Sequence, residues 1–164
     1  MMTSSARGAW IASARWCVVA GALHALAPAC GVARYRVAPI RADLELRLVD
    51  PAGRALPRLD GAGEERVGPD VLLSSEHVRQ VRIEETGGNA PRRLFLDFNE
   101  DGRALLAQVT ERHRGERIAL VVDGLVVVAP RIEEPITDGV AQLAVSDDDA
   151  FETAYQALTA GRAR

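Results

Sequence analysis

The residues best suited to nucleophilic catalysis are two serines and a histidine within four positions, Ser74, Ser75 and His77. A hydroxyl needs a neighbouring base to become a nucleophile, and that base needs a group that orients it. No Gly-x-Ser-x-Gly motif, which would present a serine on a sharp turn, occurs in the chain. A histidine among serines at the start of a helical turn is usually a surface residue, and His113 lies in a charged run that suits a helix end. We therefore expect no catalytic residue.

Acidic residues occur in pairs, but their spacing does not suit acid–base catalysis. Neighbouring carboxylates on a strand, such as Glu84 and Glu85, point to opposite faces of the sheet. No cysteine follows Cys30, and the histidines after it are His77 and His113, which excludes Cys/His zinc sites, disulfides and thiol catalysis from the body of the protein. Neither the calcium-loop nor the phosphate-loop motif occurs. The sequence therefore predicts no metal site and no cofactor.

The charge of the chain gives no indication of a nucleic-acid partner. Its 20 basic residues are all arginine, 23 residues are acidic, and the formal net charge is -3. A phosphate-binding surface usually concentrates positive charge, whereas these arginines are scattered. The chain is 48% hydrophobic and 26% charged, and its 164 residues suit one globular domain with short extensions.

Residues 1–29 have the composition of a secretory signal. They contain two arginines, no acid and an apolar stretch over residues 16–29. This stretch is shorter than the about 20 residues that a membrane-spanning helix needs. The run from Leu26 to Gly31, Leu-Ala-Pro-Ala-Cys-Gly, resembles the lipobox of bacterial lipoproteins, in which the cysteine becomes the lipidated first residue. The Ala-Pro-Ala before Cys30 also fits ordinary signal cleavage.

These features predict a lipid anchor on Cys30 that faces the periplasm, with plain secretion to the periplasm as the alternative. Removal of residues 1–29 would move the net charge from -3 to -5, because two arginines and no acid are lost. An acidic chain does not form a basic membrane patch, so we expect membrane contact only through the lipid. Residues 30–42 then form a tether, and residues 43–164 form the folded domain.

The expected domain begins with a strand and a long loop. Leucine alternates with charged residues over residues 43–50, which predicts a half-buried strand that ends at Pro51. Residues 51–69 are rich in Gly, Pro and charge and are predicted to be a loop. Such a loop is long for a compact domain, so we expect it to be mobile or functional.

A hairpin and a helix should follow. A helical turn near Ser74 precedes residues 78–85, which we expect to pair with residues 92–98 across a Gly-rich turn. Asp97 lies within the second of these strands, where a cross-strand ion pair is its expected use. Asn99 or Asp101 should cap a helix over residues 101–115.

The last third of the chain predicts three strands and a second helix. Residues 118–122 are apolar on both faces and should form a central strand, which Asp123-Gly124 turns into the strand of residues 125–129. Another strand is expected over residues 140–145. Ser146 should cap a final helix that Gly161 ends, with an apolar stripe at Phe151, Ala154, Tyr155 and Leu158. This order predicts an α+β two-layer sandwich, with two helices on one face of a mainly antiparallel sheet.

From residue 92 onward, the order of motifs resembles the head part of the large first periplasmic domain of SecD, a membrane subunit of bacterial protein export. The shared pattern is a strand that leads to a helix, a hydrophobic-Asp-Gly hairpin, an Ala-Pro pair and a final helix that ends in Leu-x-x-Gly. The matching positions are Gly102, Thr110, Arg117, Ala119, Val121, Val122, Asp123, Gly124, Ala129, Pro130, Ile132, Ile136, Gly139, Leu158 and Gly161. Residues 44–50 and 71–83 also resemble earlier family motifs.

The resemblance implies a ferredoxin-like head fold and a role in contacting unfolded, translocating polypeptide rather than in catalysis. The chain departs from the family because it lacks the six membrane spans, and because residues 139–145 lack the later Gly and Phe of the family's glycine-rich strand. We expect a binding module of the cell envelope whose partners are unfolded polypeptide or Sec and other envelope proteins, bound by strand addition at a sheet edge. The alternatives are a structural envelope lipoprotein whose loop 51–69 docks a partner, and an uncharacterised enzyme.

Replacing Cys30 with alanine tests the lipobox. A fatty-acid analogue should label the natural chain but not Cys30→Ala, because the lipobox cysteine is the residue that carries the lipid. Cys17→Ala leaves the lipobox intact and should keep its label. Equal labelling of the natural chain and Cys30→Ala would contradict the lipobox interpretation.

Overall fold

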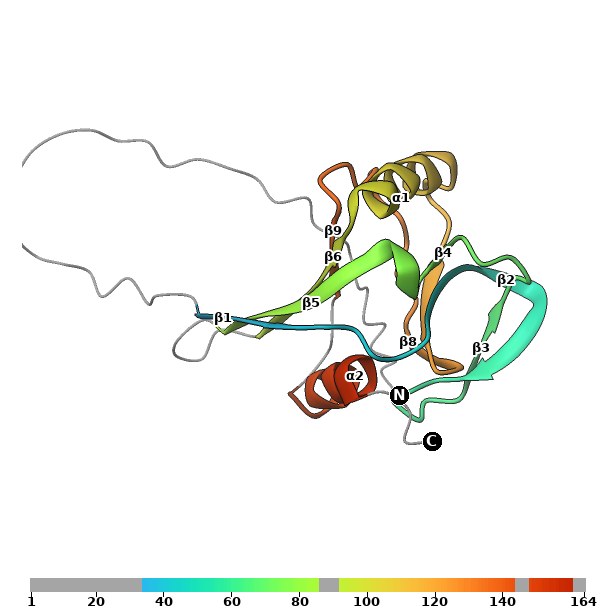
Figure 1. The fold of residues 1–164 in the computed structure, drawn as a ribbon. Helices are drawn as coiled ribbons and strands as arrows, with labels where there is room; N and C mark the ends of the chain where they lie inside the picture. Colours follow the sequence, from blue (N-terminus) through green and yellow to red (C-terminus); the bar gives the residue numbers. More distant parts are fainter. Residues whose placement is uncertain (1–33, 86–91, 144–147, 161–164) are drawn as a thin grey trace, which may run out of the picture.

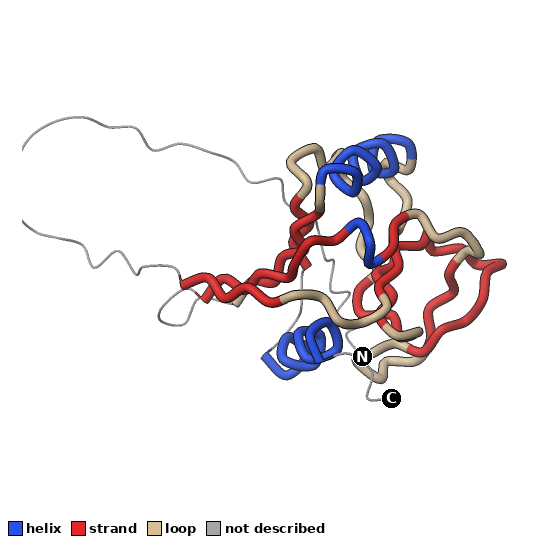
Figure 2. Tube along the Cα trace, viewed as in Figure 1, coloured by secondary structure: helices blue, strands red, loops and turns tan. Residues whose placement is uncertain are grey.

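The computed structural model describes residues 34–85, 92–143 and 148–160 (Figure 1). Their strands form two sheets, which Figure 2 shows together with the helices in the same orientation. The predicted signal at residues 1–29 and the residues Cys30, Ser146 and Gly161 lie outside the described residues.

The first sheet has four strands, and its alternating sequence decides which face is buried. The strand order is β1-β5-β6-β9, and every neighbouring pair is antiparallel. Ile83, Leu94 and Leu96 lie on one face and are at most 1% exposed, as a period of two predicts. The predicted hairpin of residues 78–85 and 92–98 is confirmed. The strands are β1 (Arg34–Ala38), β5 (Val78–Glu85), β6 (Arg93–Phe98) and β9 (Val140–Leu143).

The prediction that residues 30–42 form a tether is wrong for β1. In the antiparallel register with β5, Tyr35 lies opposite Glu84 and Val37 lies opposite Arg82. The partner of Tyr35 is 49 positions away in the chain. Five alternating residues give only a weak local indication of a strand. Strand preference depends on packing against cross-strand neighbours, and for β1 these neighbours are distant in the sequence.

The second sheet is built around β7, which is buried at all five positions. The order is β3-β2-β7-β8, and β4 pairs with the first part of β2. The prediction of a central strand at residues 118–122 is therefore confirmed. Asp123 and Gly124 have φ angles of 49° and 83°, as a tight turn into β8 requires. The strands are β2 (Leu44–Pro57), β3 (Glu64–Val67), β4 (Leu73–Ser74), β7 (Ile118–Val122) and β8 (Leu125–Val128).

The prediction that residues 51–69 form a loop is wrong, because β2 continues to Pro57 and β3 pairs with it. The pairing shifts between Val49 and Arg54, so Pro51 lies in a bulge, where it does not need to donate to the β3 ladder. Gly53 lies on the inside of this bend. A Cβ atom there would be 2.1 Å from the Val67 carbonyl oxygen, so a larger residue has no room.

The second sheet closes on itself around a small core of its own. The Leu59 amide donates to the Val126 carbonyl oxygen at 2.9 Å, and Arg58 forms a parallel bridge with Val126, so the chain beyond β2 meets β8. The long curl of β2 at the right of Figure 1 makes this closure possible. The enclosed side chains are those of Leu56, Val67, Ala119, Val121 and Val126.

The helix α1 (Glu100–Arg112) begins at a cap that joins it to the 3-10 turn η1 (Ser75–His77). Asn99 Oδ1 accepts a hydrogen bond from the Gly102 amide at 2.8 Å, and Asn99 Nδ2 donates to the Glu76 carbonyl oxygen at 2.7 Å. Of the two expected caps, the structure uses Asn99, because its side chain satisfies a helix N–H and a carbonyl group of the preceding turn at once.

Both helices contribute to one main core that the two sheets share. α2 (Asp148–Ala160) buries Phe151, Ala154 and Leu158 in this core, while α1 supplies Leu106 and Val109. The prediction of an α+β fold with two helices and mainly antiparallel strands is confirmed, but the strands form two sheets rather than one. The narrower expectation of a ferredoxin-like arrangement stays a prediction. Within the described ranges, no helix has the length and apolar character needed to cross a bilayer.

Replacing Gly102 with alanine should destabilise the fold, although alanine is the better helix former. The added Cβ would lie 2.2 Å from the His77 carbonyl oxygen, which already accepts a hydrogen bond from the Asn99 amide at 3.0 Å. We expect the free energy of unfolding in urea to fall by about 1–3 kcal/mol, the usual cost of overpacking. The exposed neighbour Asp101→Ala is the control and should cost less than about 1 kcal/mol. A Gly102→Ala variant as stable as the natural chain would show that α1 does not need this close contact.

Candidate functional site

The serine and histidine considered for catalysis form a helix cap. His77 Nδ1 accepts a hydrogen bond from the Ser74 amide at 3.1 Å and lies 3.1 Å from Ser74 Oγ. The Ser74 hydroxyl donates to Glu76 Oε1 at 3.0 Å. The ring nitrogen that faces the serine is thus occupied by a backbone donor, which is the geometry of a capping box rather than of a nucleophile and its base. In the described part of the chain, no three His, Cys, Asp or Glu side chains are grouped to hold a metal ion.

Several motif residues hold the irregular segment 129–139, called the strap here, against the rest of the core. Thr110 is 1% exposed, and its hydroxyl donates to the Leu106 carbonyl oxygen at 2.7 Å and accepts from the Ile136 amide at 2.9 Å. The Pro130 carbonyl oxygen accepts from the Ile118 amide, and the Gly139 carbonyl oxygen accepts from the Phe98 amide, both at 2.9 Å. In these contacts the motif residues bind other parts of the same chain.

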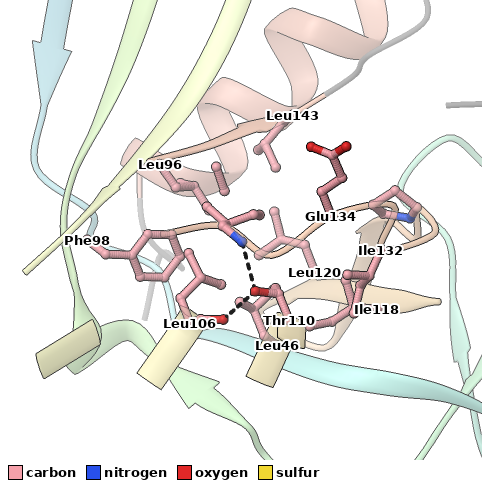
Figure 3. Close-up of a pocket in the computed structure, with 13 residues that line it drawn as sticks. Leu46, Leu96, Phe98, Leu106, Thr110, Ile118, Leu120, Ile132, Glu134 and Leu143 are labelled. Atoms are coloured by element: carbon pink, nitrogen blue, oxygen red, sulfur yellow. Dashed lines mark hydrogen bonds between the residues drawn. The ribbon is translucent and has the colours of Figure 1, made fainter. Parts of the chain in front are cut away.

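A small apolar cavity lies between the strap, α1 and both sheets (Figure 3). Its volume is ≈ 20 Å³, which is room for about one water molecule. The Thr110 hydroxyl in its lining already has both hydrogen-bond partners, so it has little capacity to orient a ligand. The cavity is therefore a gap in the packing rather than a formed binding site. Among its lining residues are Leu46, Leu96, Phe98, Leu106, Ile118 and Leu120.

The outer face of the first sheet is a more promising surface, because both helices pack on the opposite face. The core that contains Ile83, Leu94 and Leu96 also contains the buried side chains of α1 and α2. The register places a different set of side chains on the outer face, which no described helix covers (Figure 1). These are Tyr35, Val37, Gln80, Arg82, Glu84, Arg93, Phe95, Asp97, Val140 and Gln142.

A polar network lies in the middle of this outer face, and Arg82 is the residue that connects it. Its guanidinium lies 5.5 Å from the ring centre of Tyr35 and 4.6 Å from that of Phe95, so it stacks against both rings. Its Nη2 donates to Asp97 Oδ1 at 3.0 Å, and Gln80 Nε2 donates to Asp97 Oδ2 at 2.8 Å. The network links β1, β5 and β6 and satisfies the nearly buried Asp97 carboxylate, which confirms the predicted cross-strand ion pair.

The pKa of Asp97 reflects two opposing effects. Burial raises the pKa of this carboxyl group, but the hydrogen bonds from Arg82 and Gln80, together with the positive charges of Arg82 and Arg79, outweigh burial and hold the pKa below its usual value. The carboxylate is therefore charged at neutral pH and fixes the Arg82 guanidinium in place.

β1 forms one edge of this sheet, and among the described residues no strand pairs with its other side. Tyr35 and Val37 are each 55% exposed on the outer face. Arg36 points to the helix-bearing face, where its side chain is 57% exposed, pairs with Glu85 at 3.3 Å and lies 5.6 Å from the ring centre of Tyr155. An edge with unpaired backbone groups and exposed apolar side chains can accept an extended chain.

The sequence pattern indicated only part of this surface. It identified Asp97 but missed Tyr35 and Val37, because both fall in the segment predicted to be a tether. The available signal was the alternation of apolar and basic residues in Arg-Tyr-Arg-Val-Ala.

Asp97→Asn should destabilise the fold at neutral pH, because it leaves Arg82 without its charged partner. We expect a loss of about 1–3 kcal/mol at pH 7, measured by urea unfolding. A carboxyl group with a lowered pKa stabilises the folded state above its unfolded pKa of about 3.9, and this stabilisation is lost as the pH falls through the lower folded pKa. The difference between the natural chain and Asp97→Asn should therefore shrink below about pH 4.

Asp60→Asn is the matched control for this experiment. The hydrogen bond from Arg58 also lowers the pKa of Asp60, but the Asp60 side chain is 38% exposed. Solvent screens such a pair, so the control should cost less than about 1 kcal/mol. A pH-independent effect of Asp97→Asn would contradict the role given to the Asp97 charge.

Comparison with known proteins identifies relatives of the described domain. The model of the SecDF P1 head subdomain matches residues 54–160, which is more than half of the chain. The protein translocase subunit SecD of Acidaminococcus fermentans is 51% identical over 55 residues, and that of Treponema pallidum is 34% identical over 73 residues. These matches cover 34% and 44% of this chain but 13% and 12% of the relatives, so the chain spans a small part of their length.

Two solved structures share the fold. One is SecDF, described as a membrane component that enhances protein export; it has a TM-score of 0.56 and 23% identity, over 75% of this chain and 64% of that chain. The other is SecDF in its super-membrane-facing form, with a TM-score of 0.52 and 24% identity, over 70% of this chain and 18% of that chain. The family match begins within β2 and leaves β1 outside it, but it includes β5, β6, β9 and both helices. This chain belongs to the SecDF P1 head subdomain family.

Proposed function

We propose that this protein is a non-catalytic module of the cell envelope that serves protein export by binding an extended polypeptide segment as an added strand beside β1. Membership of the SecDF P1 head subdomain family supports the link to export, because its relatives are named as protein translocase subunits. The sequence pattern around Cys30 supports the location, with a lipid anchor as the attachment to the membrane.

The edge of β1 is the observation that carries the binding proposal. Among the described residues its outer backbone groups have no partner strand, and Tyr35 and Val37 expose 55% of their surface beside it. An added strand would gain main-chain hydrogen bonds with β1, and its alternate side chains would cover these two apolar residues. Unfolded polypeptide is suited to this mode because its backbone groups are not yet paired.

The cavity beneath the strap is a weaker candidate. Its volume of ≈ 20 Å³ is too small for a side chain, and hydrogen bonds from Ile118 and Ile136 hold the strap in place over it. The region 51–69 is also weaker as a docking loop than the sequence suggested. Leu56 and Val67 are 7% and 2% exposed and lie in the small core of the second sheet, so these residues maintain the fold.

The double variant Tyr35→Ser/Val37→Ser tests the β1 edge. The probe is a fluorescent eight-residue peptide in which valine and serine alternate, and binding is measured by anisotropy with the full chain. We expect the double variant to bind about tenfold more weakly, because it removes the apolar surface that the peptide would cover. Val71→Ser is the matched control, because Val71 is 43% exposed but lies between β3 and β4, and it should bind as the natural chain does.

Two N-methylated peptides separate strand addition from simple apolar contact. In an added strand, alternate amides face the neighbouring strand, so methylation of one alternate set should abolish binding and methylation of the other should not. Equal binding of both methylated peptides would argue against strand addition. Failure of every unmethylated peptide to bind would refute the proposed function.

A further inference from the structure

We infer that the β1 edge selects segments in which apolar residues alternate with acidic ones, and that Arg36 is the residue that sets this preference. The inference rests on the proposed strand addition. It concerns the class of peptide that is accepted, and it arises from β1, which lies outside the residues matched by the family model.

The two faces of β1 have different chemistry. Tyr35 and Val37 lie on the outer face, opposite Glu84 and Arg82 of β5, whereas Arg36 lies on the helix-bearing face opposite Ile83. Side chains of an added strand alternate between the same two faces. Every second residue of the bound segment would therefore lie beside Tyr35 and Val37. The residues between them would lie on the face of Arg36, which is flanked there by Arg34, opposite Glu85, and by Ala38.

The charges on the outer face are already balanced within the protein. Arg82 pairs with Asp97 at 3.0 Å and is covered by two aromatic rings. Glu84 lies 3.6 Å from Arg93, and its Oε1 accepts a hydrogen bond from the Tyr35 hydroxyl at 3.3 Å. The outer face of β1 therefore presents an aromatic and an aliphatic group to a neighbour rather than an unbalanced charge, which favours apolar side chains there.

The charge on the other face is poorly compensated. Arg36 meets Glu85 at 3.3 Å, but the two side chains are 57% and 36% exposed, and such surface pairs contribute little. The strand itself contains two arginines and no acid. A glutamate or aspartate on an added strand would form a cross-strand pair with Arg36, whereas a lysine or arginine would face a like charge.

Arg36 also disfavours self-association of the protein through β1. If two copies paired antiparallel about Arg36, the two Arg36 side chains would lie directly opposite each other on one face. A like-charged pair in that position is destabilising, and charged residues on edge strands are a common protection against unwanted pairing. The occupant that fits is therefore an acidic, alternating segment of another chain rather than a second copy of this one.

Charge-swapped peptides and an Arg36 charge reversal test this inference. The probes are eight-residue fluorescent peptides in which valine alternates with glutamate, serine or lysine, and anisotropy is measured with the full chain. We expect the glutamate peptide to bind about three- to tenfold more tightly than the lysine peptide, with the serine peptide between them. Arg36→Glu should invert this order, and Arg36→Gln should remove it. Circular dichroism establishes that each variant is folded.

Arg112→Glu is the matched control, because it makes the same change of net charge at an exposed position near the end of α1. It should leave the order of the three peptides unchanged, since only a charge beside the bound strand sets the preference. Inversion by Arg112→Glu as well would overturn the inference, because the preference would then follow the net charge.

Equal binding of the three peptides to the natural chain would overturn the charge preference but leave strand addition standing, whereas failure of all three to bind would refute both. A dimer of the natural chain that Tyr35→Ser/Val37→Ser abolishes in sedimentation would identify a second copy as the occupant and would also overturn the inference.

Discussion

The bend of β2 is the constraint on which the rest of the structure depends. The first half of this strand places Leu44 and Leu46 in the main core, and the second half places Leu56 in the small core of the second sheet. One strand can serve both cores because the chain turns between Val49 and Arg54, where Gly53 leaves room for the Val67 carbonyl oxygen. Glu65 of β3 joins this part of the second sheet to the start of β7, because its carboxylate accepts a hydrogen bond from Arg117 at 2.7 Å.

The second sheet closes on itself, and the first sheet has one face buried in the main core and one face turned to solvent. α1 and α2 bury the face that contains Ile83, Leu94 and Leu96, and the strap completes this core through the hydrogen bond between Thr110 and Ile136. Antiparallel sheets tolerate water on one side, provided that the residues there satisfy their own polar groups. Arg82, Asp97 and Gln80 meet this condition on the outer face, and they also fix the ring of Tyr35 beside the edge.

Membership of the SecDF P1 head subdomain family supports a link to protein export, and the β1 edge supports the mode of binding. The family match covers residues 54–160 and connects the domain to protein export, whereas β1 precedes it in the chain. A rigid scaffold in which β1 pairs with β5 on one side, and with no described strand on the other, is suited to transient binding of extended polypeptide, because backbone hydrogen bonds do not depend on sequence. The side chains on either side of β1 then determine which segments bind well.

The sequence by itself determined the elements whose signals are local. The period-two pattern of residues 78–85 and 92–98, the Asp123-Gly124 turn, the Asn99 cap and the apolar stripe of α2 each predict one element correctly, because each depends on neighbours within a few residues. The ion pair of Asp97 could also be predicted, since a charged side chain in the middle of a strand lies opposite a side chain of the neighbouring strand.

Only the tertiary structure decided how these elements combine. It extended β2 through Pro51 into a region predicted to be a loop, divided the strands into two sheets, and made residues 34–38 an edge strand of the candidate site. The physical reason is the same in each case. The stabilising partner of β1 lies 49 positions away, and that of Leu59 is Val126, so the preference for a strand arises only when the folded chain brings distant segments together.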